Sequence, residues 1–171
     1  QAYAGAQFNL GWMYRTGRGV DQDYVEARRW YTLAAEQGNS IAQHNLGLMH
    51  SNGRGGSVDY AAAATWWKRA ADKGHAKAIT DLPLALTLLF PPGTRIELVK
   101  MSAPRLNGLR GVVDATADGK IVCSGVGKIA VVLEGGRGTK AVLFENLVVV
   151  PPTEAEEKRR KKKEKAKRQK A

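Results

Sequence analysis

An internal repeat of 36 residues constrains the fold of this chain more than any other feature. The segment that begins at Ala6, AQFNLGWMYRTGRGVDQDYVEARRWYTLAAEQGNSI, aligns without a gap with the segment that begins at Ala42, AQHNLGLMHSNGRGGSVDYAAAATWWKRAADKGHAK. Sixteen of the 36 aligned positions are identical. A fixed period in this range is typical of solenoids, in which each structural unit stacks on the next.

Each repeat is predicted to form two helices. In the first repeat, residues 6–15 place apolar side chains at helical spacing, and this helix is expected to stop at Gly17. The second helix is expected to begin after Asp23, a good N-cap residue, and to end at Gly38. The second repeat shows the same pattern 36 residues later.

Arg-Gly clusters at 16–24, 52–60 and 135–139 have three possible interpretations: phosphate-binding loops, RNA-binding Arg-Gly boxes, or turns. Neither repeat copy has a Lys followed by Ser or Thr, and no strand precedes either copy, so the match to a Walker loop is poor. We therefore interpret the first two clusters as turns between helices. Arg18 and Arg54 are expected to be solvated or paired with the aspartate five residues further on.

The pattern A-x-x-x-L-G-x-x-Y-x-x-G-x-G, followed after a short polar loop by A-x-x-W-Y-x-x-A-A-x-x-G, resembles the Sel-1-like repeat, a relative of the tetratricopeptide repeat. The resemblance covers roughly residues 1–78 and implies an α-solenoid over residues 1–82 that begins within an earlier unit. The pattern fails after Ala78. Residues 76–90 are therefore expected to be a degraded capping element with a short helix on each side of Pro83, and residues 83–91 are assigned as the capping segment and linker.

The resemblance also implies a binding surface, because such solenoids bind partners on the concave face that the first helix of each repeat lines. Carried over by position, that face includes Phe8, Trp12, Arg15, His44, Leu48 and Ser51. Aromatic side chains together with arginine are frequent in binding hot spots. Phe8, Trp12 and Leu48 could instead pack against a neighbouring unit.

Residues 92–150 change from helical periodicity to the alternation typical of strands, with turn signals such as ADGK between them. The string PPGTRIELV...PRLNGLRGVV...KIAVVLEGG...KAVLFENLVVV resembles small SH3-like barrel modules, which implies contacts to peptide or nucleic acid and no catalysis. The candidate site is the loop with Arg105, Asn107 and Arg110, which could also be a plain hairpin connection. Phe144 is the only aromatic residue of this segment, which argues against binding of proline-rich ligands.

More than half of the net positive charge lies at the end of the chain. The formal net charge is +11, and residues 153–171 hold ten Lys or Arg against four Asp or Glu. Residues 151–171 are predicted to form a basic tail that is disordered or marginally helical. Its run of Lys158, Arg159, Arg160, Lys161, Lys162 and Lys163 resembles a nuclear import signal and would contact polyanions weakly, or it could simply keep the chain soluble.

The sequence contains no recognisable catalytic motif. Its three histidines lack the spacing of a metal site, and its single cysteine, Cys123, lies in an apolar context. We therefore expect a non-enzymatic scaffold without cofactor or metal, which binds a protein segment on the solenoid and is located in the cytoplasm or nucleus. The alternative is a nucleic-acid-associated factor that binds through the barrel and the tail.

Overall fold

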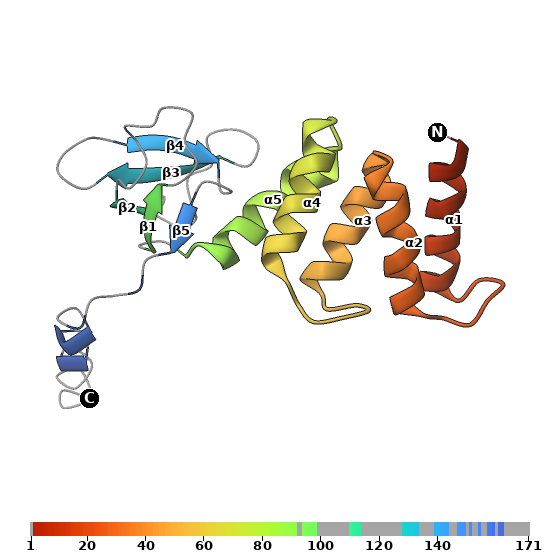
Figure 1. Cartoon of the computed structure of the whole chain (residues 1–171), viewed down its shortest axis with the longest axis horizontal. Helices are drawn as coiled ribbons and strands as arrows, with labels where there is room; N and C mark the ends of the chain where they lie inside the picture. The colour runs from red at the N-terminus through yellow and green to blue at the C-terminus, as the bar shows by residue number, and fades with distance from the viewer. Residues whose placement is uncertain are drawn as a thin grey trace.

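The computed structural model describes residues 2–91, 94–98, 110–113, 128–133, 139–143 and 147–149, and residues 151, 154, 157–159, 161 and 162. The first of these ranges forms a row of five helices, and five short strands follow (Figure 1). The helices are α1 (Ala2–Thr16), α2 (Tyr24–Glu36), α3 (Ser40–Ser51), α4 (Tyr60–Asp72) and α5 (Ala76–Leu89). The two predicted helical hairpins are confirmed as α1–α2 and α3–α4.

The second helix of each hairpin begins where the sequence predicted. Asp23 accepts hydrogen bonds from the backbone N–H groups of Val25 and Glu26, and Asp59 accepts one from Ala62. These carboxylates satisfy N–H groups that have no partner inside the helix. Gly17 and Gly53, at φ values of 72° and 65°, adopt the left-handed backbone conformation that glycine permits, so the turn interpretation of both Arg-Gly loops is confirmed.

The two hairpins are packed through the same pair of positions. In α1 the backbone at Gly11 lies against the Tyr31 ring of α2, and in α3 the backbone at Gly47 lies against the indole of Trp67 in α4. Tyr31 is fully buried and Trp67 is 3% exposed. The indole Nε1–H of Trp67 also donates a hydrogen bond to the carbonyl oxygen of His44 at 3.0 Å. A glycine in the first helix thus lets a large aromatic side chain of the second helix enter the core.

A polar contact joins the first hairpin to the second. Arg28 donates one hydrogen bond to the ring of His50, whose Nδ1 lies 2.7 Å from Nη2, and another to the carbonyl oxygen of Gly55 at 3.3 Å. His50 is buried, and its burial together with the charge of Arg28 lowers its pKa. A neutral imidazole accepts from the guanidinium, so the contact links α2 to α3 without requiring a buried pair of like charges.

One prediction about the end of the solenoid was wrong. We expected a short helix on each side of Pro83, but α5 runs through it as a single helix and crosses residue 82, the predicted end of the solenoid. A proline inside a helix costs about 3 kcal/mol. Leu82, Ala85 and Leu86 are buried on the same helix, and burial of two leucine side chains alone stabilises by about 3 to 6 kcal/mol. The apolar face therefore outweighs the break.

The strands form an antiparallel sheet of order β4-β3-β2-β1-β5. Their bounds are β1 (Arg95–Leu98), β2 (Arg110–Val113), β3 (Lys128–Leu133), β4 (Thr139–Leu143) and β5 (Leu147–Val149). The last strand pairs with the first, with Glu97 opposite Val148. The buried strand residues Ile96 and Val131 belong to the same apolar cluster as Trp67 and Leu86, so the core of the second hairpin continues into the sheet.

Candidate functional site

Three hollows lie next to one another along α3. Leu48 lines all three, and side chains of α1, α5 and the loop after α3 complete them. The largest has a volume of about 530 Å³ and lies between the end of α1 and the beginning of α5. We call the three together the α3 groove. Its lining residues are Arg15, Ile41, His44, Asn45, Leu48, Met49, Ser51, Asn52, Arg54, Tyr60, Trp67, His75, Ala76, Lys77, Asp81, Leu84, Ala85 and Leu88.

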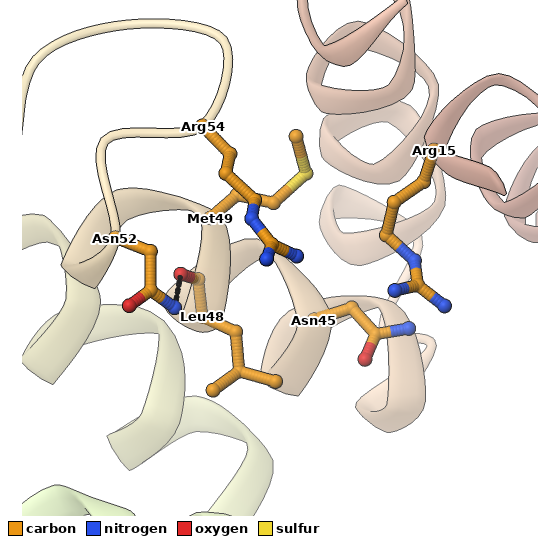
Figure 2. Close-up of a pocket in the computed structure, with 6 residues that line it drawn as sticks. All are labelled: Arg15, Asn45, Leu48, Met49, Asn52 and Arg54. Carbon is orange, nitrogen blue, oxygen red and sulfur yellow. Dashed lines mark hydrogen bonds between the residues drawn. The ribbon is translucent and has the colours of Figure 1, made fainter. Parts of the chain in front are cut away.

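The part of the groove between α1 and the loop after α3 is basic. Figure 2 shows that the guanidinium groups of Arg15 and Arg54 extend from two sides toward Asn45. Arg15 donates from Nε to the Tyr31 hydroxyl at 3.2 Å, and the Arg54 guanidinium lies 5.4 Å from the centre of the Tyr24 ring. Each arginine is therefore held by an aromatic residue of α2.

Tyr31 remains neutral at physiological pH although Arg15 lies beside its hydroxyl. Burial raises the pKa of Tyr31, and this effect is larger than the opposing effect of the Arg15 charge. Tyr31 therefore presents a hydroxyl, and the positive charge of Arg15 is not neutralised by a phenolate.

An imidazole pair lies at the beginning of α5. The rings of His44 and His75 are stacked with their centres 4.7 Å apart, and His44 Nε2 lies 2.9 Å from a carboxylate oxygen of Asp81. His75 is also the N-cap of α5, where its Nδ1 accepts from the N–H of Ala78 at 3.3 Å. Burial and the neighbouring His44 lower the pKa of His75. The pair therefore positions α5 against α3.

The remaining part of the groove, between α3 and α5, is mainly apolar, although the polar residues Ser51, Asn52, Tyr60 and Asp81 also line it. Leu84 and Leu88 lie one turn apart on α5 and are 62% and 48% exposed. They line a hollow with Leu48 and Ser51, and the buried Trp67 contributes to its wall. Neighbouring exposed leucines in a hollow are a feature of binding surfaces more than of a plain solvent face.

Four of the six residues predicted to face a partner line the α3 groove: Arg15, His44, Leu48 and Ser51. Phe8 and Trp12 are half-buried against the core of the first hairpin, and the Phe8 ring lies 5.7 Å from that of Tyr31. Within the described residues these two line none of the hollows just described. A partner role for any of the six stays a prediction.

Several groove residues were missed from the sequence. Asn45 was not among the predicted site residues, and Leu84 and Leu88 were assigned to the capping segment and linker. Arg54 was expected to be solvated or paired with Asp59; it is exposed and forms no ion pair with Asp59 among the described residues, in agreement with the first alternative, but its place in the groove was not foreseen. Helical spacing of leucines across Pro83 was the signal that could have identified the α5 side.

The other predicted contacts are described only in part. Arg105 and Asn107 of the predicted barrel loop lie outside the described residues, and Arg110 is the first residue of β2, with its backbone alone described. In the tail, Lys158, Arg159, Lys161 and Lys162 are helical and exposed, whereas Arg160 and Lys163 lie outside the described residues. Their predicted contacts to polyanions stay predictions.

Metal and membrane sites were also sought in the described part of the chain. No group of His, Cys, Asp or Glu side chains in that part could hold a metal ion. No described helix combines the length and apolar character that crossing a bilayer requires. Cys123 lies outside the described residues.

Comparison with known proteins identifies the helical hairpins. The model of the Sel1 repeat matches residues 4–39 and again residues 40–75. The chain therefore contains two Sel1 repeats. They correspond to α1–α2 and α3–α4 with the period of 36 residues seen in the sequence. Sel1-repeat proteins generally mediate protein–protein interaction. No protein of curated function matches the chain.

Two solved structures resemble part of the chain at 39% sequence identity. One is a Sel1 repeat protein from Oxalobacter formigenes, with a TM-score of 0.48, and the match covers 50% of this chain and 35% of that protein. The other is c5321, a protective antigen present in uropathogenic Escherichia coli strains, with a TM-score of 0.49, and the match covers 52% of this chain and 19% of that protein. The chain thus spans about a third or less of either relative.

Proposed function

We propose that this chain is a non-enzymatic scaffold that binds a segment of a partner protein in the α3 groove. The observation that carries the proposal is the continuity of the groove: Leu48 belongs to all three hollows, which join a basic part at Arg15 to an apolar part at Leu84. A continuous groove of mixed polarity is suited to an extended polypeptide, because successive side chains meet different surroundings.

The test is a pair of matched variants in co-purification with nuclease-treated extract. Leu84→Arg places a bulky charge in the groove, whereas Val25→Arg places it on α2; both positions are helical, and they are 62% and 64% exposed. We expect Leu84→Arg to abolish recovery of protein partners and Val25→Arg to retain it. Circular dichroism melting checks that both variants fold. Equal recovery by the two variants would contradict the proposal.

We further propose that the sheet is an SH3-like barrel. The strand order places β5 beside β1, which brings the last strand back to the first as closure of such a barrel requires. Cross-strand backbone proton contacts in the NMR spectrum of the full chain test this proposal. Contacts that close β4 onto β5 are expected, and two free outer strands would contradict it.

A second candidate function is nucleic-acid association through the barrel and the tail. The observation in its favour is that the described cations of the tail, among them Lys158 and Lys162, are exposed. Binding of this kind weakens steeply as the salt concentration rises. The barrel contributes if a chain without residues 153–171 still binds a labelled oligonucleotide. If that deletion removes all binding, the barrel has no such role.

A further inference from the structure

We infer that the α3 groove selects an acidic, extended segment of a partner protein that also carries one bulky apolar side chain. The acidic residues would lie against Arg15, Arg54 and Lys77, and the apolar side chain would enter the hollow between Leu48, Leu84 and Leu88. This inference rests on the proposed function and names the chemistry of the occupant.

The charge of the lining residues carries the first part of the inference. Within the described residues, Arg15, Arg54 and Lys77 form no ion pair, so their charges are available to a ligand. Asp81 is the only carboxylate among the lining residues described above, and His44 lies 2.9 Å from it. The groove is therefore positive, and a segment with several Asp or Glu residues is complementary to it.

The two arginines are held before any ligand arrives. Arg15 is fixed through Nε by the Tyr31 hydroxyl, and among the described residues its terminal nitrogens have no hydrogen-bond partner, so they can donate in parallel to a carboxylate. Arg54 rests over the Tyr24 ring at 5.4 Å. A side chain that is already held loses less conformational freedom on binding. Figure 2 shows both guanidinium groups directed toward the side of Asn45, where a single acidic stretch could meet the two.

The apolar part carries the second element of the inference. Leu84 and Leu88 are 62% and 48% exposed, which leaves aliphatic surface in contact with water at the edge of a hollow. A Leu or Phe side chain of a ligand that fills this hollow is stabilised because it leaves water. A phosphate or a ribose gains nothing from contact with exposed leucine side chains, so Leu84 and Leu88 favour a polypeptide over a nucleic acid.

The amide side chains support an extended ligand. Asn45 lines the basic part of the groove and Asn52 lines both the basic and the apolar part; Asn52 Nδ2 donates to the carbonyl oxygen of Leu48 at 2.9 Å. An asparagine side chain both donates and accepts, which matches the N–H and C=O groups that an extended backbone leaves unpaired.

Selection from random twelve-residue peptides displayed on phage tests the inference with the full chain as bait. We expect enriched peptides to combine Asp or Glu residues with one Leu, Ile, Phe or Met. Enrichment of basic or uncharged peptides would overturn the acidic preference. If those peptides still lose binding with Leu84→Arg, the proposed function stands while this inference fails. If no peptide is enriched, both fail.

Synthetic copies of the most enriched peptide then test the assignment of residues by fluorescence anisotropy. Arg54→Glu should weaken binding about fivefold or more, because charge reversal replaces an attraction by a repulsion. Arg69→Glu on α4 is the matched control, since both arginines are exposed and lie over an aromatic ring, and it should change the affinity less than twofold. The assignment would be overturned if the two variants weakened binding equally. It would also be overturned if a single-stranded oligonucleotide displaced the labelled peptide as strongly as the unlabelled peptide does.

Discussion

Substitution of Gly47 by alanine should destabilise the solenoid more than a change of one methyl group ordinarily does. A Cβ atom at this position would lie 2.5 Å from Cδ1 of Trp67 and even nearer to its Nε1. Separations below about 3.0 Å do not occur for real Cβ atoms, so the indole would have to move. Trp67 is 3% exposed and donates a hydrogen bond to the His44 carbonyl oxygen, so it cannot move without loss.

The magnitude follows from three contributions. Overpacking a core costs about 1 to 3 kcal/mol, and leaving the indole N–H or the carbonyl without its partner costs about 1 to 3 kcal/mol more. Alanine has a better helix propensity than glycine, which stabilises the folded state by about 1 kcal/mol. The net expectation for Gly47→Ala is a decrease of about 1 to 5 kcal/mol in the free energy of unfolding.

Urea denaturation followed by circular dichroism measures this decrease. Gly5→Ala is the matched control, because Gly5 lies in α1 and, apart from its chain neighbours and its own helix backbone, no described atom lies within 4 Å of the Cβ that would be added. That variant should gain up to about 1 kcal/mol. A Gly47→Ala variant as stable as Gly5→Ala would refute the packing argument, since the two changes differ only in what the methyl group meets.

Three further predictions concern the pH dependence, the helix caps and α5. The pKa of His50 is lowered from 6.5 in the folded state, so the unfolded chain takes up a proton first as the pH falls below 6.5. The free energy of unfolding should therefore decrease with falling pH, by at most about 1.4 kcal/mol per pH unit for this group. Urea titrations at several pH values measure this slope, and His50→Gln should reduce it. Asp59→Ala should lower the free energy of unfolding by about 1 kcal/mol, whereas Asp59→Asn should retain most of the stabilisation that the N-cap provides. Pro83→Ala should raise the melting temperature, with a gain of up to about 3 kcal/mol, and a lower melting temperature would show that the proline is needed in α5.

The repeat made the hairpins predictable from the sequence. Asp23 and Asp59 carry their own signal, because an N-cap carboxylate acts on backbone groups two or three residues away. The glycines of the loops are likewise determined locally. The period of 36 residues then fixed which helices are equivalent, and so which face the first helices share.

The groove itself could not be predicted in the same way. His44 meets Asp81 across 37 positions of the chain, and the sequence contains no local sign of that contact. The course of α5 through Pro83 depends on the burial of Leu82 and Leu86, which is a tertiary effect that a local rule for proline omits. The exposed leucines of α5 line the groove only because that helix continues past Pro83, which the sequence did not predict.

Site-specific photo-crosslinking tests the central claim most directly. A benzophenone amino acid is introduced in place of Leu88 in one variant and in place of Val25 in another, since both side chains are exposed but only Leu88 lines the α3 groove. Illumination in nuclease-treated extract should crosslink a protein to position 88 and none to position 25, and the enriched acidic peptide should suppress the crosslink. Equal crosslinking at both positions, or a crosslink that the peptide leaves unchanged, would contradict the account.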